Sequence, residues 1–331
     1  MTVLFCANPG YFQHLAAAAR SVADTSPGSA VDFHVLTCDS DAEAERKLRD
    51  SLSDDRLSLT IHRVGDARLN DFFVDKFMSK ECYLRIFAPE VLSSDLDRVL
   101  YLDCDLVVLD DLRPLWESAL GGKAVGAAPD YPRLPSVISP TRRRQLGIPL
   151  DQVYVNSGVL LIDLVRWRKL GLTRRILDYV ETMGPALEFY DQDAINAVLS
   201  DELFLLDCRW NLQARMYACG RQAFPLEFEA TREARRRPAI LHYTGSEKPW
   251  LFRSRIPRKG DYFAALSRTQ WAGALPRVQG SAQRLEFRFG RMLALMGFDY
   301  MQAAHYLRRL GGLVTRRTAR RVTGSGPRPA P

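Results

Sequence analysis

The sequence predicts an α/β fold in which a mixed β-sheet is flanked by helices. Strand-like and helix-like segments alternate through the first hundred residues, an order typical of a parallel sheet covered by helices. The chain has 331 residues, which suits one large core with a small appendage better than an array of domains. Hydrophobic residues make up 47% and charged residues 26% of the chain, and this balance excludes wholesale disorder.

The first part of the chain predicts three strands separated by two helices. In order, these are strand 3–7, helix 12–22, strand 31–37, helix 40–54 and strand 57–64. Pro27 and Gly28 end the first helix, and the spacing of Ser40 and Glu43 is that of a capping box at the start of the second. Such a beginning is typical of nucleotide-binding α/β proteins.

The later part of the chain adds four predicted strands and one helix. The strands are 98–103, 125–129, 153–162 and 239–243, and the helix begins at Asp191. The strand at 98–103 ends in acidic residues. Because open α/β sheets bind ligands at the carboxyl ends of their strands, a binding site is expected there.

Two aspartates at this strand end have the spacing Asp-x-Asp. Four such pairs occur in the chain, at 39/41, 95/97, 103/105 and 191/193, so the pattern alone selects none of them. Only Asp103 and Asp105 directly follow an apolar strand and precede another apolar run, 106–109. Two carboxylates placed in this way can converge on a divalent cation that neutralises a diphosphate. A solvated turn at the strand end also fits the pattern.

Five ordered blocks stand out along the chain: Leu102 to Asp105, Asn156 to Asp163, Asp191 to Asp193, Trp210-Asn211 and His242 to Trp250. In this order they resemble glycosyltransferase family 8, which includes bacterial lipooligosaccharide galactosyltransferases and glucosyltransferases as well as glycogenin. The resemblance spans about residues 1–255. It implies a GT-A fold and a retaining enzyme that moves a hexose, galactose or glucose, from a UDP-sugar to a glycan acceptor such as a lipopolysaccharide or lipooligosaccharide core.

The resemblance also implies the site residues. Asp103, Asp105 and His242 would ligate Mn²⁺ or Mg²⁺, although a histidine on a late strand is also compatible with ordinary burial. The UDP-sugar donor would be bound by Ala7, Asn8, Tyr11, Arg85, Asp103, Cys104, Asp105, Asn156, Ser157, Asp191, Gln192, His242, Gly245 and Lys248. Asn8 stands where the family usually has an aspartate, so the contacts to the uridine differ from the family pattern.

The catalytic residues expected from the resemblance are Gln192, Asp191 and Lys248. Lys248 would stabilise the charge on the departing diphosphate, and Gly245 would let the backbone approach it. An amide such as Gln192 is a poor nucleophile, which favours a front-face substitution over two successive displacements. Asp191 and Asp193 keep the covalent route open.

The C-terminal part differs in composition from the rest. Residues 281–331 carry ten arginines and two acidic residues, 10 − 2 = +8, so the first 280 residues sum to 7 − 8 = −1. We predict a catalytic domain at 1–280, a basic amphipathic helical extension at 281–322 and a disordered tail at 323–331. The extension suits an anionic membrane surface, and a helix docked on the catalytic domain also fits.

The six cysteines are scattered and form no C-x-x-C pair, which favours a reducing compartment. The apolar start is too short for a signal peptide, and no apolar run is long enough to span a membrane. We therefore expect a cytoplasmic protein that is either soluble or peripheral on the inner face of the cytoplasmic membrane.

The acceptor is expected to be a glycan or a lipid-linked saccharide, with the loops at 75–79 and 130–135 shaping its pocket. Two rival functions fit parts of the sequence. A catalytically silent UDP-sugar-binding or membrane-scaffold protein would release no UDP. A nucleic-acid-binding protein is disfavoured, because the neutral body lacks a base-reading module.

Overall fold

The computed structural model describes residues 1–65, 80–130, 139–218, 228–229 and 231–278, with a few single positions between 280 and 288. The chain divides into two compact units. The first consists of Met1–Pro249 and Arg255–Ala274, and the second of Trp250–Ser254 with the residues from Leu275 onward. All site residues predicted above belong to the first unit.

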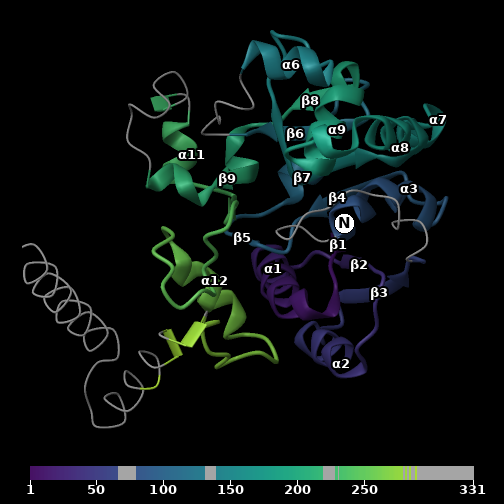
Figure 1. The fold of residues 1–331 in the computed structure, drawn as a ribbon. Helices are drawn as coiled ribbons and strands as arrows, with labels where there is room; N and C mark the ends of the chain where they lie inside the picture. Colours follow the sequence, from purple (N-terminus) through teal and green to yellow (C-terminus); the bar gives the residue numbers. More distant parts are fainter. Residues whose placement is uncertain are drawn as a thin grey trace, which may run out of the picture. The chain divides into compact units, whose positions relative to one another are not determined.

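A seven-stranded mixed sheet forms the centre of the first unit (Figure 1). Its strands are β1 (Thr2–Cys6), β2 (Val31–Thr37), β3 (Leu57–Arg63), β4 (Arg98–Leu102), β6 (Val125–Pro129), β7 (Val155–Asp163) and β8 (Leu203–Leu205). They lie in the order β3-β2-β1-β4-β7-β6-β8. The pairs β1–β2, β2–β3, β1–β4 and β6–β8 are parallel, whereas β7 is antiparallel to both β4 and β6. The predicted mixed sheet is confirmed.

A second sheet of three short strands lies at the end of β4. It contains β5 (Leu106–Val108), β9 (Leu212–Gln213) and β10 (Ile240–His242), in the order β5-β10-β9. The sequence predicted the strand at 239–243 but not its separation into this small sheet. The small sheet decides where His242 lies, because β10 pairs antiparallel with β5, the strand that follows the two aspartates.

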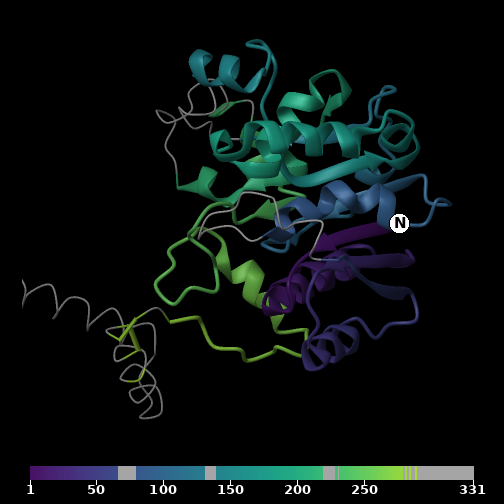
Figure 2. The ribbon, with the colours of Figure 1, turned by 45° about the vertical axis from the view of Figure 1, so that its right-hand side comes forward.

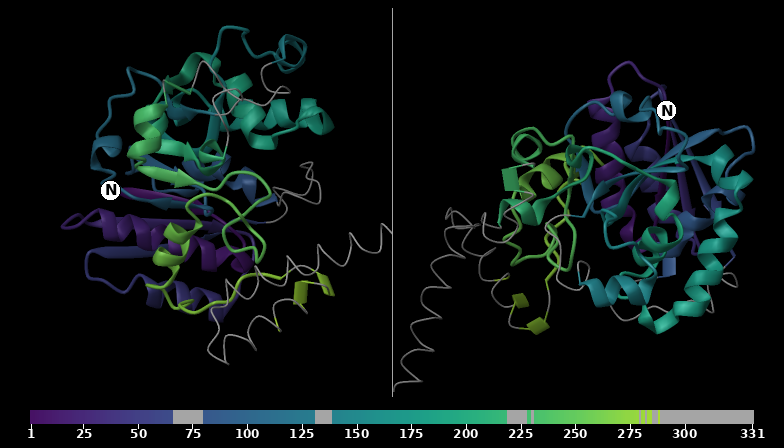
Figure 3. Two further views of the ribbon diagram at one scale, coloured as in Figure 1. Left: turned by 90° about the vertical axis from the view of Figure 1, so that its left-hand side faces the viewer. Right: turned by 90° about the horizontal axis from the view of Figure 1, so that it is seen from above.

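Helices cover both faces of the large sheet, because alternate residues of each strand are apolar on opposite sides. Val3 and Phe5 of β1 pack with α1 (Phe12–Thr25) and α2 (Ala42–Ser51) on one face. Leu4 faces the other side, in the cluster with α7 (Leu164–Lys169), α8 (Leu172–Met183) and α9 (Tyr190–Val198). Figure 3 (right) shows the purple and teal helices on the two sides of the strands.

The remaining helices are short. The α-helices are α3 (Ala88–Val91), α4 (Arg113–Trp116), α6 (Pro140–Leu146), α11 (Arg232–Arg236) and α12 (Lys259–Leu266). The 3-10 turns are η1 (Pro9–Tyr11), η3 (Lys80–Phe87), η4 (Gly184–Ala186), η5 (Ser200–Glu202), η6 (Cys208–Asn211) and η7 (Ala214–Tyr217). Two of these turns contain predicted site residues, Tyr11 in η1 and Arg85 in η3. The turn η3 also contributes buried side chains, such as Tyr83 and Ile86, to the core.

The second helix begins later than its sequence suggested. Asp41, rather than Ser40, is the N-cap of α2, and its carboxylate accepts the backbone N–H groups of Glu43 and Ala44, each at 3.0 Å. An aspartate is as good a cap as a serine and adds a charge that the helix N-terminus stabilises. The capping-box assignment was therefore shifted by one residue.

Helix α12 fixes the segment that follows β10. It lies beside α1 (Figure 2), where the His14 Nδ1 and the Tyr262 hydroxyl are 2.7 Å apart. The Tyr243 hydroxyl donates to the carbonyl of Arg258 at 2.9 Å, so both ends of the loop that carries Lys248 are tied together. This loop is thereby held next to the end of β10.

Within the described ranges, no helix is long and apolar enough to cross a membrane. Most of the predicted amphipathic extension at 281–322 and the whole tail at 323–331 lie outside the described residues. Both remain predictions from composition.

Candidate active site

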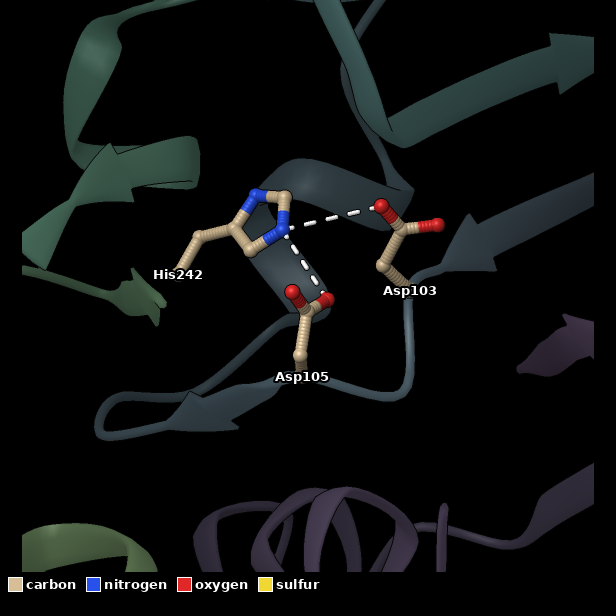
Figure 4. Close-up of side chains that lie close together, drawn as sticks. All are labelled: Asp103, Asp105 and His242. Atoms are coloured by element: carbon tan, nitrogen blue, oxygen red, sulfur yellow. Dashed lines mark hydrogen bonds and ion pairs between the residues drawn. The ribbon is translucent and has the colours of Figure 1, made fainter. Parts of the chain in front are cut away.

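Asp103, Asp105 and His242 converge at the carboxyl end of β4. Figure 4 shows the two carboxylates and the imidazole pointing toward one another. His242 Nε2 lies 3.1 Å from Asp105 Oδ1 and 3.6 Å from Asp103 Oδ2. One ligand atom from each of the three residues lies within 4.8 Å of the others, and no other such group of histidine, cysteine and acidic side chains occurs in the described part of the chain.

Strand register brings these distant residues together. Both aspartates lie in the short turn between β4 and β5, and the Asp103 N–H donates to the carbonyl of Gly158 at 2.8 Å. His242 pairs with Leu106 across the small sheet, and the next residue, Tyr243, donates its N–H to the carbonyl of Asp105 at 2.9 Å. The histidine is therefore placed by backbone pairing with the aspartates' own turn.

Lys248 adds a cation to this cluster. Its ammonium group donates to Asp105 Oδ2 and, at 2.8 Å, to the carbonyl of Tyr243. Burial works to raise the pKa of Asp105, but the charges of Lys248 and His242 and their hydrogen bonds hold this pKa well below its usual value. Asp105 is therefore a carboxylate at every physiological pH.

Gly158 leaves the room in which the cluster sits. A Cβ atom at this position would lie 2.2 Å from His242 Cε1 and 2.7 Å from Asp103 Oδ2, closer than real Cβ contacts. Gly158 lies on β7, which pairs with β4. Only glycine lets this strand pass so close to the two side chains.

Arg85 joins the acidic turn to the start of α9. Its guanidinium is 3.1 Å from Asp103 Oδ1 and 3.3 Å from Asp191 Oδ2, and it donates to the carbonyls of Cys82 and Ser157 at 2.9 and 2.7 Å. The side chain is only 5% exposed. Burial opposes the charge, but Asp103 and Asp191 outweigh it and raise the pKa of Arg85 well above its ordinary value.

Asp191 is a buried carboxyl with unusual electrostatics. Burial raises the pKa of Asp191 to about 6, and the nearby charge of Arg85 offsets only part of this effect. Its Oδ2 atom is also one of the few buried side-chain oxygens, among the residues the structure describes, that accept no hydrogen bond. The atom lies near Arg85 without the alignment that a hydrogen bond requires.

A chain of amide side chains leads away from His242. His242 Nδ1 is 2.8 Å from Asn211 Oδ1, and Asn211 Nδ2 donates to Asn156 Oδ1 at 2.8 Å. Asn156 Nδ2 donates to Gln192 Oε1 at 3.0 Å, and Gln192 Nε2 donates to Asp130 Oδ2 at 3.3 Å. The three amide residues are buried. They connect His242 and the two aspartates beside it to the start of α9 in one polar network.

Asp130 ends this network and is itself well held. Besides Gln192, it accepts hydrogen bonds from Gln213 Nε2 and, at 3.0 Å, from Arg215. The sequence placed Asp130 only in a loop that shapes the acceptor pocket. The rest of that loop, 131–135, and the other acceptor loop, 75–79, lie outside the described residues.

The carboxylate of Asp193 is engaged by neighbouring groups of the protein rather than open to a ligand. Its carboxylate accepts from the Tyr154 hydroxyl at 2.6 Å and from the N–H groups of Glu188 and Phe189 at 2.9 and 3.0 Å, and it pairs with Arg142 at 3.2 Å. These contacts fix the segment that leads into α9.

The residues expected at the nucleotide end lie around the carboxyl end of β1, which neighbours β4. Ala7 is buried, Asn8 is the N-cap of η1, and Tyr11 is 39% exposed with its ring edge-on to His14. Cys104 is buried with its thiol 3.6 Å from the carbonyl of Cys6, and burial raises its pKa well above the ordinary value. Cys104 thus faces the protein interior.

The other two predicted positions also lie near the cluster. Ser157 is on β7, where its carbonyl and hydroxyl both accept from Arg85. Gly245 follows β10 with a φ of 82°, in the left-handed region that favours glycine, and a Cβ there would meet nothing within 4 Å. The glycine at 245 is therefore required by backbone conformation and not by crowding.

The sequence reasoning assigned no role to Gly158, Asn211, Gln213 or Arg215. Asn211 was part of the Trp210-Asn211 block, which was the one available signal for it. Gly158 was part of the Asn156 to Asp163 block, where it received no role of its own. Gln213 and Arg215 become visible only through their hydrogen bonds to Asp130.

The donor set fits a divalent cation. Two carboxylates and an imidazole present oxygen and nitrogen atoms, the ligand types that Mn²⁺ and Mg²⁺ accept in proteins. The absence of a Cβ at Gly158 keeps side-chain atoms out of the space beside Asp103 and His242. The arrangement can therefore bind a cation next to a cationic lysine, which suits a substrate with a diphosphate.

Comparisons with known proteins identify relatives of this chain. A family model described as glycosyl transferase family 8 matches residues 2–254. General stress protein A of Bacillus subtilis is 26% identical over 276 residues, which are 82% of this chain and 94% of that protein. Lipopolysaccharide 1,2-glucosyltransferase of Escherichia coli K12 is 25% identical over 299 residues, 88% of this chain and 85% of that protein.

Among solved structures, the galactosyltransferase LgtC, in complex with donor and acceptor sugar analogues, is similar in fold. The TM-score is 0.71 at 26% identity, over 81% of this chain and 96% of that one. This likeness confirms the expected GT-A fold. Because the family model also matches well over half of the sequence, the chain belongs to glycosyltransferase family 8.

Proposed function

We propose that this glycosyltransferase moves galactose or glucose, with retention of configuration, from a UDP-sugar to a glycan acceptor while Asp103, Asp105 and His242 hold Mn²⁺ or Mg²⁺. The observation that carries the proposal is the convergence of these three side chains within 4.8 Å. The activities named for the Escherichia coli relative and for the galactosyltransferase structure support a hexose and a lipopolysaccharide or lipooligosaccharide core as acceptor.

The leaving-group end is built from Lys248, Gly245 and the acidic turn. A bound cation would supply charge neutralisation for the diphosphate. Lys248, already held beside Asp105, adds a point charge for oxygens that become more negative as the glycosidic bond breaks. The left-handed backbone at Gly245 lets main-chain groups of this loop approach a diphosphate.

The sugar end is built from Arg85, Asn156, Ser157, Asp191 and Gln192. Asp191 Oδ2 is a buried acceptor without a hydrogen bond, so a hydroxyl of the donor sugar would satisfy it. Arg85 lies beside this carboxylate and beside Asp103, which keeps the distance between sugar and diphosphate sites fixed. We assign hydroxyl binding to these five residues.

The chemistry proposed is a front-face substitution. The bond from the sugar C1 to the phosphate oxygen breaks, the acceptor hydroxyl oxygen bonds to C1 on the same face, and its proton goes to the departing phosphate oxygen. Gln192 steadies the positive charge on the sugar in the transition state. The carboxylate of Asp193 is engaged by four partners, so Asp191 is the stronger candidate for the alternative covalent route.

The uridine is assigned to the carboxyl end of β1. Ala7 lines this site, Asn8 supplies an amide that hydrogen-bonds the base or ribose, and the half-exposed Tyr11 stacks on the base. Cys104 contributes through its backbone, because its thiol points to the carbonyl of Cys6.

The proposal is tested by UDP release from UDP-galactose, UDP-glucose and their two N-acetyl forms, with Mn²⁺ and a core-oligosaccharide acceptor. We expect one of the two hexose donors to be turned over fastest. Asp103→Asn should abolish turnover, whereas Asp39→Asn, at an exposed Asp-x-Asp pair outside the site, should leave it unchanged. Binding of the donors without UDP release would instead support a catalytically silent UDP-sugar-binding protein.

A further inference from the structure

The polarity of the amide chain at the site is fixed by two backbone groups of β7. The N–H of Gly158 donates to Asn156 Oδ1 at 3.0 Å, and the N–H of Ser157 donates to Gln192 Oε1 at 3.1 Å. A backbone N–H can only donate, so the atoms facing it must be the oxygens of the two amides. Neither Asn156 nor Gln192 can be turned over without leaving these donors opposite an amide nitrogen.

This polarity passes through Asn211 to the histidine. Because Asn156 Oδ1 is fixed as an acceptor, the Asn211 atom 2.8 Å from it must be the donor nitrogen Nδ2. Asn211 Oδ1 is then the atom 2.8 Å from His242 Nδ1. An oxygen at that distance requires a hydrogen on Nδ1. His242 Nε2 is left as the ring nitrogen that faces Asp103 and Asp105.

We propose that Asn211 is a positioning residue, which keeps the hydrogen of His242 on Nδ1 so that the Nε2 lone pair is available to a cation. The inference rests on the proposed function and names a residue to which that function assigned no role. A histidine ligand binds metal through its unprotonated nitrogen, and the partner of the other ring nitrogen selects which one that is.

Burial makes the selection effective. Asn211 is 1% exposed and His242 is 2% exposed, so water does not replace the amide as a partner for Nδ1. Asn211 comes from η6 and His242 from β10, and the Ala239 N–H donates to the carbonyl of Arg209 at 3.0 Å between these segments. The backbone therefore holds the amide and the imidazole at a fixed separation.

Two substitutions separate positioning from simple packing. Asn211→Leu keeps the approximate shape but offers Nδ1 no acceptor. Asn211→Asp keeps an acceptor for Nδ1 and loses only the donor to Asn156. If Asn211 acts through His242, the aspartate variant preserves cation binding and the leucine variant does not. If it serves only the fold, both variants weaken binding together with stability.

The cation measurement uses the full-length protein and Mn²⁺ alone, titrated by electron paramagnetic resonance. We expect Asn211→Leu to bind Mn²⁺ about 10- to 100-fold more weakly than the wild type, the range found when the partner of a ligand histidine is removed. Asn211→Asp should stay within about threefold by the same measure, because its carboxylate replaces the acceptor. Equal weakening in both variants, or unchanged affinity in Asn211→Leu, would overturn the proposal.

A second measurement is made on the wild-type protein, and it uses a variant only to assign the signals. The ring nitrogens of the wild-type protein are observed by nuclear magnetic resonance with ¹⁵N-histidine, without cation and with diamagnetic Mg²⁺. The chain has five histidines, and His242→Gln identifies the signals of interest by their loss. We expect hydrogen on His242 Nδ1 in both samples. A His242 Nδ1 without hydrogen in either sample would contradict the inference.

The two measurements also distinguish this inference from the proposed function. Wild-type protein that binds no Mn²⁺ would refute cation use, and with it the role of Asn211 toward a cation. Wild-type protein that binds Mn²⁺ through Asp103 and Asp105, but shows hydrogen on Nε2 of His242 instead of Nδ1, would refute the role of Asn211 and leave the proposed function intact.

Discussion

At the scale of single residues, the site depends on groups that are held from several sides. Arg85 shows this best, since its one guanidinium contacts two carboxylates and two carbonyls, and it also lies 4.3 Å from the centre of the Tyr101 ring. A buried arginine is tolerated only with such pairing. The same guanidinium fixes the distance between Asp103, which we propose to bind the cation, and Asp191, which we propose to bind the sugar.

Gly158 gives the sharpest steric prediction. In Gly158→Ala the new methyl group would overlap His242 and Asp103, so these side chains must move apart. We expect Mn²⁺ affinity and UDP release each to fall more than about tenfold, as for other losses at a metal site. Gly260→Ala is the control, because a Cβ there meets nothing within 4 Å. Unchanged Mn²⁺ affinity in Gly158→Ala would show that the cation binds elsewhere.

Asp191 gives a prediction in pH. Its pKa of about 6 in the folded protein exceeds the ordinary 3.8, so the folded state holds the proton more tightly than the unfolded state. Protonation of Asp191 therefore stabilises the folded state by about 3 kcal/mol, from the size of this pKa shift. This contribution is complete below the ordinary pKa and is lost as pH rises through 6.

The variant Asp191→Asn mimics the protonated form at every pH. We therefore expect it to unfold at higher denaturant concentration than the wild type at pH 8 and at a similar concentration at pH 4, while most UDP-sugar turnover is lost. Urea titrations at the two pH values measure the first effect. A variant less stable than the wild type at pH 8 would mean that Arg85 stabilises the Asp191 carboxylate more than burial destabilises it.

The predictability of the site from the sequence differs from residue to residue. Asp103 and Asp105 were selected by the apolar strand before them, which is local information. His242 required the resemblance to the family, because a histidine on an apolar strand is usually just buried. Gly158 and Asn211 lay in two of the quoted blocks but received no role, since the first matters through the pairing of β7 with β4 and the second through an amide chain across three elements.

At the scale of elements, the start of α9 decides where the second carboxylate pair points. Tyr190 takes a positive φ of 46°, rare for a residue other than glycine, and α9 begins there. Asp191 and Asp193 then face different surroundings, because two residues along a helix turn the side chain by more than half a circle. Asp191 contacts Arg85, whereas Asp193 accepts hydrogen bonds from the segment before the helix.

We predict that Asp193 acts through stability. Asp193→Asn should lower the free energy of unfolding by about 1–3 kcal/mol, because buried donors lose their acceptor. Asp201→Asn, at an exposed aspartate of the following turn, should change it by less than about 0.5 kcal/mol. Chemical denaturation checks both. A glycosyl adduct trapped on Asp193 would contradict this assignment and revive its role as a nucleophile.

Strands were easier to predict than their partners. The ranges 31–37 and 125–129 match β2 and β6, because apolar runs bounded by polar residues carry a local signal. The two-residue strand β9 and the three-residue β8 carry no such signal. Their place follows from backbone pairing with β10 and β6, which patterning along the chain does not encode.

At the scale of the whole molecule, the large sheet and the small sheet meet at the acidic turn. β4 belongs to the first and β5 to the second, so the two aspartates occupy the connection between them. Gly158 of β7 and His242 of β10 lie against this connection, and Arg85 links it to Asp191 at the start of α9. The proposed cation ligands thus come from distant parts of the sequence, since His242 and Asp105 are 137 positions apart.

The basic C-terminal part makes a prediction for the whole chain that rests on composition. Its +8 charge favours an anionic membrane surface at up to about 1 kcal/mol per cation. Deleting residues 282–331 should weaken sedimentation with vesicles containing anionic lipid and leave UDP release in solution unchanged. Vesicle binding equal to that of the full chain would refute the proposal that this part reaches the inner face of the cytoplasmic membrane.

The central claim is that Asp103, Asp105 and His242 hold the cation on which sugar transfer depends. The most direct test is the initial rate of UDP release from the preferred UDP-hexose, after chelator treatment and during re-addition of Mn²⁺. We predict no turnover without cation, full recovery with Mn²⁺ in the wild type, and no recovery in Asp105→Asn at the same Mn²⁺ concentration. Equal rates in chelator and in Mn²⁺, or full recovery in Asp105→Asn, would contradict the claim.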